Sequence, residues 1–140
     1  DGATHRLRAV DRAFGVDLRL EPGKGTTAHG RDGLSRKGTQ AGNASYYYSM
    51  TRMPTTGHLV VDGETVAVTG ASWMDHEFGT TFIEASQVGW DWFSLQLDDG
   101  SELMVFQLRG ADGAADADLA RPFRDRGEHD VHNANSPHKQ

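Results

Sequence analysis

The sequence predicts an all-β protein made of short antiparallel strands. Apolar and polar residues alternate through the centre of the chain, residues 41–109, and many apolar positions carry aromatic or β-branched side chains, as in half-buried strands. Glycine is frequent, at 17 of 140 residues, which indicates many tight turns. No segment before residue 110 has the sustained apolar period of a helix. These observations favour a closed barrel or a sandwich, and composition does not choose between them.

Two hairpins are predicted in the centre of the chain. Residues 59–68 and residues 95–104 each contain two strand-like runs joined by an Asp-Gly pair. The pairs are Asp62-Gly63 and Asp99-Gly100, and such pairs supply the positive φ angles of a tight turn. Both segments are therefore expected to fold back on themselves.

The first part of the chain is more polar but also contains strand patterns. Residues 5–10 and residues 14–20 are each expected to form a strand, and Pro22 with the glycines after it is expected to end their pairing. Together with the centre this makes about eight short strands. A barrel of about eight strands can hold one small ligand in its interior.

The composition argues against several kinds of partner and site. The formal net charge of −6 and the lack of a clustered basic surface argue against nucleic acid as a partner. Without cysteine there is no disulfide framework and no thiolate chemistry. No apolar run approaches the roughly 20 residues that span a bilayer, and the polar start of the chain is not a signal peptide. The motifs of serine hydrolases, phosphate-binding loops and dinucleotide-binding folds are absent.

A strand over residues 45–53 carries three consecutive tyrosines. Its period of two places Tyr46 and Tyr48 on one face and Tyr47 on the other. One interpretation is that these rings pack a half-buried sheet and form hydrogen bonds at its rim. The other is that Tyr46 and Tyr48 form the aromatic wall of a ligand pocket.

Three consecutive ionisable residues, Asp75, His76 and Glu77, interrupt a strand pattern between large apolar groups. In a regular strand Trp73, Asp75 and Glu77 share one face, while His76 lies on the other. A carboxyl group beside a second carboxylate and an indole is favoured in its protonated form, as a general acid requires. The alternative is a solvated rim cluster whose carboxylates pair with Arg52 or Arg36. No metal site is expected, because one histidine with adjacent carboxylates is a weak ligand set.

A third strand, over residues 88–97, is rich in aromatic residues. Trp90 and Trp92 share one face, which suits either a ligand-binding lumen or an outer surface. The opposite face, with Phe93 and Leu95, is expected to join the core.

Four blocks of the sequence together resemble the AttH-like family: residues 35–38, 42–49, 70–79 and 89–100. That family includes the carotenoid 1,2-hydratases, also called hydroxyneurosporene synthases, and bacterial proteins described as predicted secreted hydrolases. The resemblance runs from about Thr4 to Gly113. It implies an all-β, lipocalin-like antiparallel β-barrel that is present here only in part.

The resemblance also implies a domain organisation. Residues 1–113 correspond to an incomplete lipocalin-like domain, and residues 114–140 form a polar tail without strand pattern that is expected to be disordered. Family members have two consecutive barrels, so a second lipocalin-like domain is expected in the full-length protein. Open barrel edges invite self-association. The family suggests a secreted or periplasmic location.

The resemblance places the chemistry in the ionisable block. In the hydratases an aspartate protonates the terminal double bond of an isoprenoid chain, and that residue resembles Asp75. His76 and Glu77 complete the candidate catalytic set. The candidate substrate-binding set consists of aromatic residues that attract the resulting cation, namely Tyr46, Tyr48, Trp73, Trp90 and Trp92. No cofactor is implied.

Three functions follow as hypotheses. The first is acid-catalysed addition of water to an apolar isoprenoid-like molecule in the barrel lumen. The second is a carrier that binds a hydrophobic ligand, an isoprenoid or a lipid, without turnover. The third is a hydrolase, for which the sequence offers no recognisable pair of nucleophile and base. An Asp75 that faces the lumen and is dry favours catalysis, whereas an exposed Asp75 favours binding.

Overall fold

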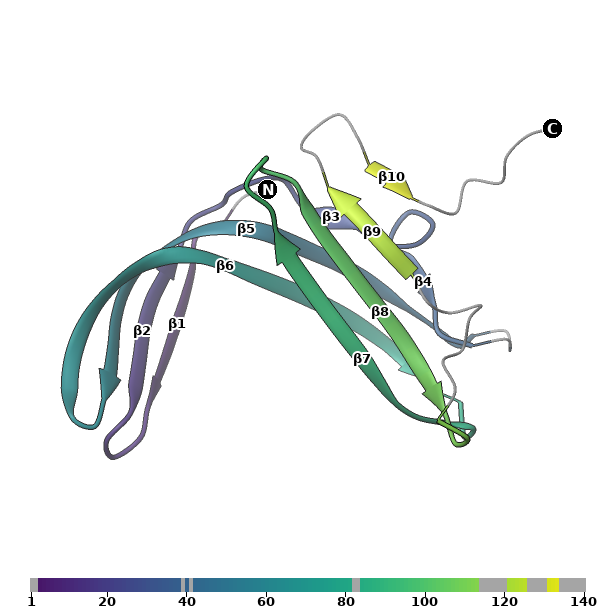
Figure 1. Ribbon diagram of the computed structural model, residues 1–140, viewed down its shortest axis with the longest axis horizontal. Coiled ribbons are helices and arrows are strands. Elements are labelled where there is room, and N and C mark those ends of the chain that lie inside the picture. The colour runs from purple at the N-terminus through teal and green to yellow at the C-terminus, as the bar shows by residue number, and fades with distance from the viewer. Residues whose placement is uncertain are drawn as a thin grey trace. The chain divides into compact units, whose positions relative to one another are not determined.

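The computed structural model describes residues 3–38, 40, 42–81, 84–113, 121–125 and 131–133, and all regular structure in them is β-strand. The predicted all-β class is therefore confirmed. No helix in this part of the chain is long and apolar enough to cross a membrane. The described strands, shown in Figure 1, are β1 (His5–Val10), β2 (Gly15–Leu20), β3 (Thr27–Ala28), β4 (Leu34–Arg36), β5 (Ala44–Val61), β6 (Glu64–Thr81), β7 (Gln87–Gln96), β8 (Glu102–Gly110), β9 (Arg121–Asp125) and β10 (Val131–Asn133).

The strands form two hydrogen-bonded sheets. In the first sheet the order is β1-β2-β5-β3, and β4 and β6 also pair with β5. In the second sheet the order is β10-β9-β8-β7. The pairings of β2, β3 and β4 with β5 and those within the second sheet are antiparallel. Over the described strands the two sheets do not close into one ring, as expected for a barrel present in part.

The chain divides into two compact units. The first unit consists of Asp1–Thr26 and Met50–Met74, and the second of Thr27–Ser49 and Asp75–Gln140. The long strands β5 and β6 contribute to both units, with the ends nearest their shared turn in the first. The second unit contains β3, β4 and the whole second sheet, and it holds the candidate site.

In the first unit, the predicted strands near the start are found almost unchanged. β1 has the predicted bounds, and β2 begins at Gly15, one residue after the predicted start. The two strands pair from His5 with Leu20 to Val10 with Gly15. The pairing ends at Leu20, just before Pro22, as predicted.

The first predicted hairpin turn is also confirmed. β5 ends at Val61 and β6 begins at Glu64, so Asp62 and Gly63 form a two-residue turn. Their φ angles are +52° and +83°, which is the conformation of a type I′ hairpin turn. The right-handed twist of this turn matches that of the flanking strands.

Replacing Gly63 with Ala should destabilise the protein by about 1 kcal/mol, because an L side chain is strained in the left-handed region. Gly70 is the matched control. It lies in β6 without a positive φ, and a Cβ added there meets no atom within 4 Å. Urea unfolding should show a lower midpoint for Gly63→Ala and an unchanged or higher midpoint for Gly70→Ala. Equal midpoints for the two variants would contradict this account of the turn.

The second hairpin turns where predicted but with different geometry. Gly100 has a positive φ of +80°, whereas Asp99 does not. The Gly100 amide donates to the Leu97 carbonyl at 3.1 Å, and the Leu97 amide donates to the Ser101 carbonyl at 2.8 Å. This is a three-residue loop, a type I turn followed by a left-handed glycine. Asp99 instead accepts a hydrogen bond from the Ser101 amide at 2.9 Å, which fixes the loop.

The tail differs from the prediction of no strand after Gly113. β9 pairs with β8 from Glu102 with Asp125 to Phe106 with Arg121, and β10 continues the sheet on the far side of β9. β8 alternates strongly and needs a partner along its second edge, which a polar strand can supply through its backbone alone. The rest of the tail, residues 114–120, 126–130 and 134–140, lies outside the described residues.

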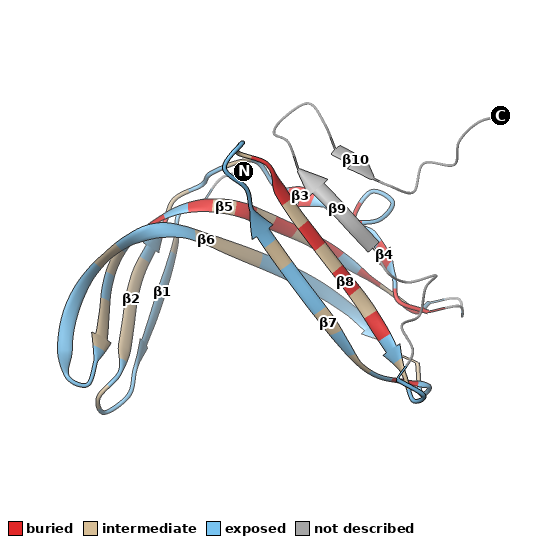
Figure 2. Cartoon of the chain, in the orientation of Figure 1, coloured by how far each residue is buried: buried red, intermediate tan, exposed pale blue. Residues whose placement is uncertain are grey.

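Burial in the second unit follows the two-residue period of the strands (Figure 2). On β8 the side chains of Met104, Phe106 and Leu108 are all at most 5% exposed, and their neighbours are intermediate or exposed. The predicted core face of β7 is not buried in this way, since Phe93 is 61% and Leu95 50% exposed. The core therefore lies on the face of the second sheet that carries the buried β8 residues.

Candidate functional site

The buried face of β5 in the second unit carries Ser45, Tyr47 and Ser49, which are at most 4% exposed. Backbone pairing sets this orientation. β4 pairs with β5 around Ser45, β3 pairs with it at Ser49, and the His29 amide donates to the Tyr47 carbonyl at 2.9 Å. Tyr46 lies on the opposite face and is 52% exposed. Of the three tyrosines, Tyr47 is the one on the buried side.

β6 divides the ionisable block between two faces. The Ser45 hydroxyl donates to Glu77 and the Ser49 hydroxyl donates to Asp75, so both carboxylates lie on the same side as the buried face of β5. The predicted shared face of the two carboxylates is therefore present. Both residues keep substantial exposure.

His76 lies on the opposite face of β6 in an aromatic cluster. Its ring stacks on Tyr48 at 5.1 Å between centroids and meets Phe78 edge-on at 5.4 Å. Tyr46 stacks on Phe78 at 5.5 Å. Three predicted site residues, Tyr46, Tyr48 and His76, are thus assembled together but away from the two carboxylates.

The indoles of β7 face the buried side of the second sheet. Trp90 pairs with Leu108 and Trp92 pairs with Phe106, and directly paired residues project from the same face of an antiparallel sheet. Because Phe106 and Leu108 are buried, this face of β7 is the inner one. Trp90 is nevertheless 61% and Trp92 38% exposed, so the indoles line an open pocket on this face, and the choice between a lumen and an outer surface stays a prediction.

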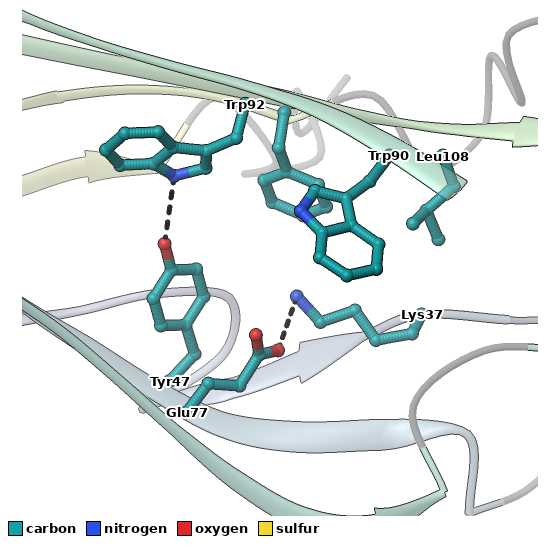
Figure 3. Close-up of a pocket in the computed structure, with 7 residues that line it drawn as sticks. Lys37, Tyr47, Glu77, Trp90, Trp92 and Leu108 are labelled. Carbon is teal, nitrogen blue, oxygen red and sulfur yellow. Dashed lines mark hydrogen bonds and ion pairs between the residues drawn. The ribbon is translucent and has the colours of Figure 1, made fainter.

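A cavity of about 270 Å³ lies within the second unit, which approaches the lower end of small-molecule pockets. Figure 3 shows it between the strands that carry Tyr47 and Glu77 and those that carry the tryptophans and Leu108. Seven residues line it: Lys37, Tyr47, Glu77, Trp90, Trp92, Phe106 and Leu108. Five of them are large apolar or aromatic groups, and the charged residues Lys37 and Glu77 form a pair.

The Lys37 ammonium is the most buried charge of this pocket. Its side chain is 7% exposed, and Nζ lies 2.6 Å from Oε1 of Glu77 (Figure 3). Nζ also lies 4.4 Å from the ring centroid of Phe106 and 4.9 Å from that of Tyr47. The ion pair therefore joins a buried cation, flanked by two aromatic rings, to a carboxylate that is 35% exposed.

The backbone of Lys37 is fixed by two loops. Its amide donates to the Asn43 carbonyl at 2.8 Å, and its carbonyl accepts from the buried Gln87 side chain at 2.9 Å. Glu84 ties the same loops together, since it accepts from the Asn43 side chain at 3.1 Å. These bonds fix the backbone position from which the Lys37 side chain enters the pocket lining.

A hydrogen-bonded chain runs from His29 through Ser49 to Asp75. His29 Nε2 lies 2.6 Å from the Ser49 oxygen, whose hydroxyl donates to Asp75. Since Ser49 donates to the carboxylate, Nε2 of His29 is the donor to Ser49. Burial lowers the pKa of His29 to about 4, although the negative charge of Asp75 acts to raise it. The ring is therefore neutral near pH 7.

Tyr47 connects this chain to the pocket. Its hydroxyl accepts a hydrogen bond from Trp92 Nε1 at 3.3 Å (Figure 3). Burial raises the pKa of Tyr47, and the charge of Asp75 together with a hydrogen bond to it raises that pKa further. The phenol is therefore protonated, and Asp75 lies beside it.

The predicted site residues thus separate into groups. Glu77, Trp90 and Trp92 line the pocket, and Asp75 adjoins it through Tyr47. Trp73 belongs to the first unit and is half-buried. Tyr46, Tyr48 and His76 lie on the opposite face of β5 and β6, where the sequence pattern already placed His76 relative to the carboxylates.

Several important residues were not predicted. Lys37 and His29 belong to short or irregular segments whose contacts depend on distant strands, and Tyr47 was assigned to the other face of its strand. The signal for Lys37 was its place in the 35–38 block of the resemblance. The partner of Glu77 is Lys37 in place of the expected Arg36 or Arg52. Among the described residues no group of three or more His, Cys, Asp or Glu side chains is placed to hold a metal ion.

Solved structures similar to the chain include two proteins of known fold. A crystal structure from Nitrosomonas europaea assigned to AttH is 36% identical, with a TM-score of 0.77, over 86% of this chain and 36% of that one. Kievitone hydratase from Nectria haematococca is 19% identical, with a TM-score of 0.63, over 85% of this chain and 36% of that one. The chain thus spans about a third of either structure. Both matches confirm the predicted lipocalin-like β fold.

Family membership rests on a match over nearly the whole sequence. No curated protein matches the chain significantly. The family model described as AttH-like matches residues 1–136, which extends beyond Gly113, where the resemblance seen in the sequence ended. The chain therefore belongs to the AttH-like family.

Proposed function

We propose that this protein binds an apolar, isoprenoid-like small molecule in the pocket and adds water to one of its double bonds by acid catalysis. The observation that carries this proposal is the pocket itself, in which Trp90, Trp92 and Phe106 surround a small polar group of charged and phenolic side chains. Aromatic faces stabilise carbocations as well as bind hydrocarbon. The structural neighbour kievitone hydratase is named for the same class of reaction.

Asp75 is the proposed proton donor. Ser49 donates to Oδ1 of its carboxyl group, and in the proposal the transferred proton is carried on Oδ2. Transfer of that proton to an alkene carbon breaks the π bond and leaves a cation on the neighbouring carbon. A water molecule then forms the new C–O bond and returns a proton to the Asp75 carboxylate, so the net change is addition of one water.

Glu77 is less suited to this role. Its carboxylate is paired with the Lys37 ammonium at 2.6 Å and accepts a hydrogen bond from Ser45, so both interactions engage it in binding. In the proposal Glu77 therefore helps to bind the ligand and is not the proton donor.

The test is hydration of an acyclic isoprenoid by the full-length protein, followed by chromatography of the alcohol formed. Binding is followed in parallel by quenching of tryptophan fluorescence, since Trp90 and Trp92 line the pocket. We expect the alcohol to accumulate with time and with enzyme concentration. Quenching without any alcohol would rule out hydration, and the absence of both would rule out the pocket as a site for such ligands.

The carrier function is the second candidate, and one observation favours it. Asp75 is exposed and is not among the residues that line the cavity. A ligand held only by the lining residues would not contact the Asp75 carboxyl group. Tight binding without turnover in the same assay is the result expected of a carrier.

The structure gives little support to a hydrolase. His29 and Ser49 are in contact at 2.6 Å, like a base and a nucleophile. However, Ser49 is 0% exposed and its hydroxyl already donates to Asp75, so no acyl group can reach it. The contact between His29 and Ser49 instead helps to position Asp75.

A further inference from the structure

The Lys37 ammonium has hydrogen-bonding capacity that the described residues leave unfilled. An ammonium carries three N–H donors, and in the part of the chain that the structure describes Glu77 is the one oxygen partner found for Nζ. Its other close neighbours are the rings of Tyr47 and Phe106. Ring faces attract the charge but do not replace an oxygen acceptor. At 7% exposure the side chain has little water to bond instead.

The free side of this ammonium is directed toward the cavity. Figure 3 shows Nζ between the Glu77 carboxylate and the indole of Trp90, at the end of a stem that follows the pocket wall. The Asn43 and Gln87 bonds fix the backbone from which the stem starts, and the ion pair with Glu77 holds the ammonium at its end. A ligand oxygen in the cavity would lie within reach of it.

The charge of the pair selects the kind of oxygen. Lys37 and Glu77 neutralise each other, so a carboxylate or phosphate would gain from the cation and lose to the anion. A neutral hydroxyl, carbonyl or phenol oxygen can accept from the ammonium without that conflict. A pure hydrocarbon would leave an N–H donor of the Lys37 ammonium without an acceptor. A buried polar group without a hydrogen bond lowers the binding free energy gained.

We propose that Lys37 is the specificity-determining residue of the pocket, and that it selects ligands with a neutral hydrogen-bond-accepting oxygen at one end of an apolar body. The inference rests on the proposed binding function and narrows it to an oxygenated ligand. Trp90 and Leu108 cover the apolar body, and the oxygen lies against Nζ. The double bond to be hydrated is then held at a defined distance from the oxygenated end.

Three probes with a common carbon skeleton test this selection. Geraniol carries a neutral hydroxyl, geranic acid carries a carboxylate, and the third probe is the hydrocarbon of the same skeleton without oxygen. Binding to the full chain is measured by tryptophan quenching. We expect geranic acid to bind no more tightly than geraniol. Much tighter binding of the acid would show that the site recognises an anion and would overturn the proposal.

The variant for the test is the double replacement Lys37→Met with Glu77→Gln. Removing both charges together avoids a buried unpaired charge, and Met keeps the length of the apolar stem. Geraniol affinity should fall about ten-fold, as for loss of a hydrogen bond to a charged group. Affinity for the hydrocarbon should stay the same or rise. The control is Lys24→Met, which lies in the first unit and should change neither affinity.

The outcomes separate the two proposals. If geraniol and the hydrocarbon bind the wild-type protein but lose affinity equally in the double variant, Lys37 does not select for oxygen, and the apolar pocket stands. If neither probe binds the wild-type protein, the proposed binding function fails together with this inference. Circular dichroism of the double variant confirms that it keeps the β fold before affinities are compared.

Discussion

Replacing Asp75 with Asn is expected to reduce hydration by at least 10²- to 10⁴-fold, the range attributed to general acid catalysis. The amide has nearly the same shape and still accepts the hydrogen bond from Ser49. It cannot give up a proton to an alkene. Ligand affinity should therefore stay within a few-fold of the wild-type value, because Asp75 is not among the residues that line the cavity.

Glu77→Gln is the matched control for this experiment. The two carboxylates lie two residues apart on one face of β6, and each accepts a hydrogen bond from a serine of β5. Glu77→Gln should weaken ligand binding and stability, since it leaves the buried Lys37 ammonium without its anionic partner. Turnover at saturating substrate should fall less than in Asp75→Asn.

The result is read from kcat and tryptophan quenching together. An Asp75→Asn protein that hydrates as fast as the wild type would remove Asp75 as the acid. A larger loss of kcat in Glu77→Gln than in Asp75→Asn would transfer the role to Glu77. If both variants and the wild type bind tightly without turnover, the carrier function is favoured.

Local patterns were enough to predict the strands and most turns. Asp62-Gly63 forms its turn as predicted because the conformation depends on those two residues and the flanking strands alone. At Asp99-Gly100 the same dipeptide gives a longer loop, because Ser101 bonds back to Asp99 and shifts the pairing. The dipeptide therefore predicts the position of a turn more surely than its type.

The sequence could not show which face of a strand is buried. The two-residue period places Tyr46 and Tyr48 together in either case, and only long-range partners choose which set is buried. β3 and β4, of two and three residues, make that choice by pairing with β5, together with His29, the residue after β3. Strands so short have no clear pattern. The same limit applies to Lys37, whose role depends on β6 and β8.

On β7 the shared face of Trp90 and Trp92 could be predicted, because the partner strand β8 is adjacent in the chain. The pairing of Trp90 with Leu108 and of Trp92 with Phe106 is fixed by the hairpin. The two indoles therefore share the face of a strongly alternating strand. Phe93 and Leu95 are exposed, although their face of β7 is apolar in the sequence. An apolar strand face is therefore not always buried.

The neutral imidazole of His29 makes stability depend on pH. The ring is 5% exposed, and burial lowers its pKa from 6.5 to about 4 against the opposing charges of Asp75 and Glu77. Between these two values the unfolded chain binds a proton that the folded protein does not, so the free energy of unfolding falls as the pH falls. Above about pH 6.5 both states carry a neutral ring and this contribution is constant.

Wild-type protein should therefore lose roughly 2 to 3 kcal/mol of stability through His29 between about pH 7 and about pH 4.5, by the linkage of protonation to unfolding. His29→Gln keeps a hydrogen-bonding group next to Ser49 but cannot titrate, so its stability should fall less over the same interval. His76→Gln is the matched control and should behave like wild type, because that ring is exposed on the opposite face. Urea unfolding followed by tryptophan fluorescence at both pH values measures the three slopes. If wild type and His29→Gln lose the same stability on acidification, the buried His29 does not couple folding to pH, and the hydrogen-bonded chain to Asp75 is more hydrated than the structure shows.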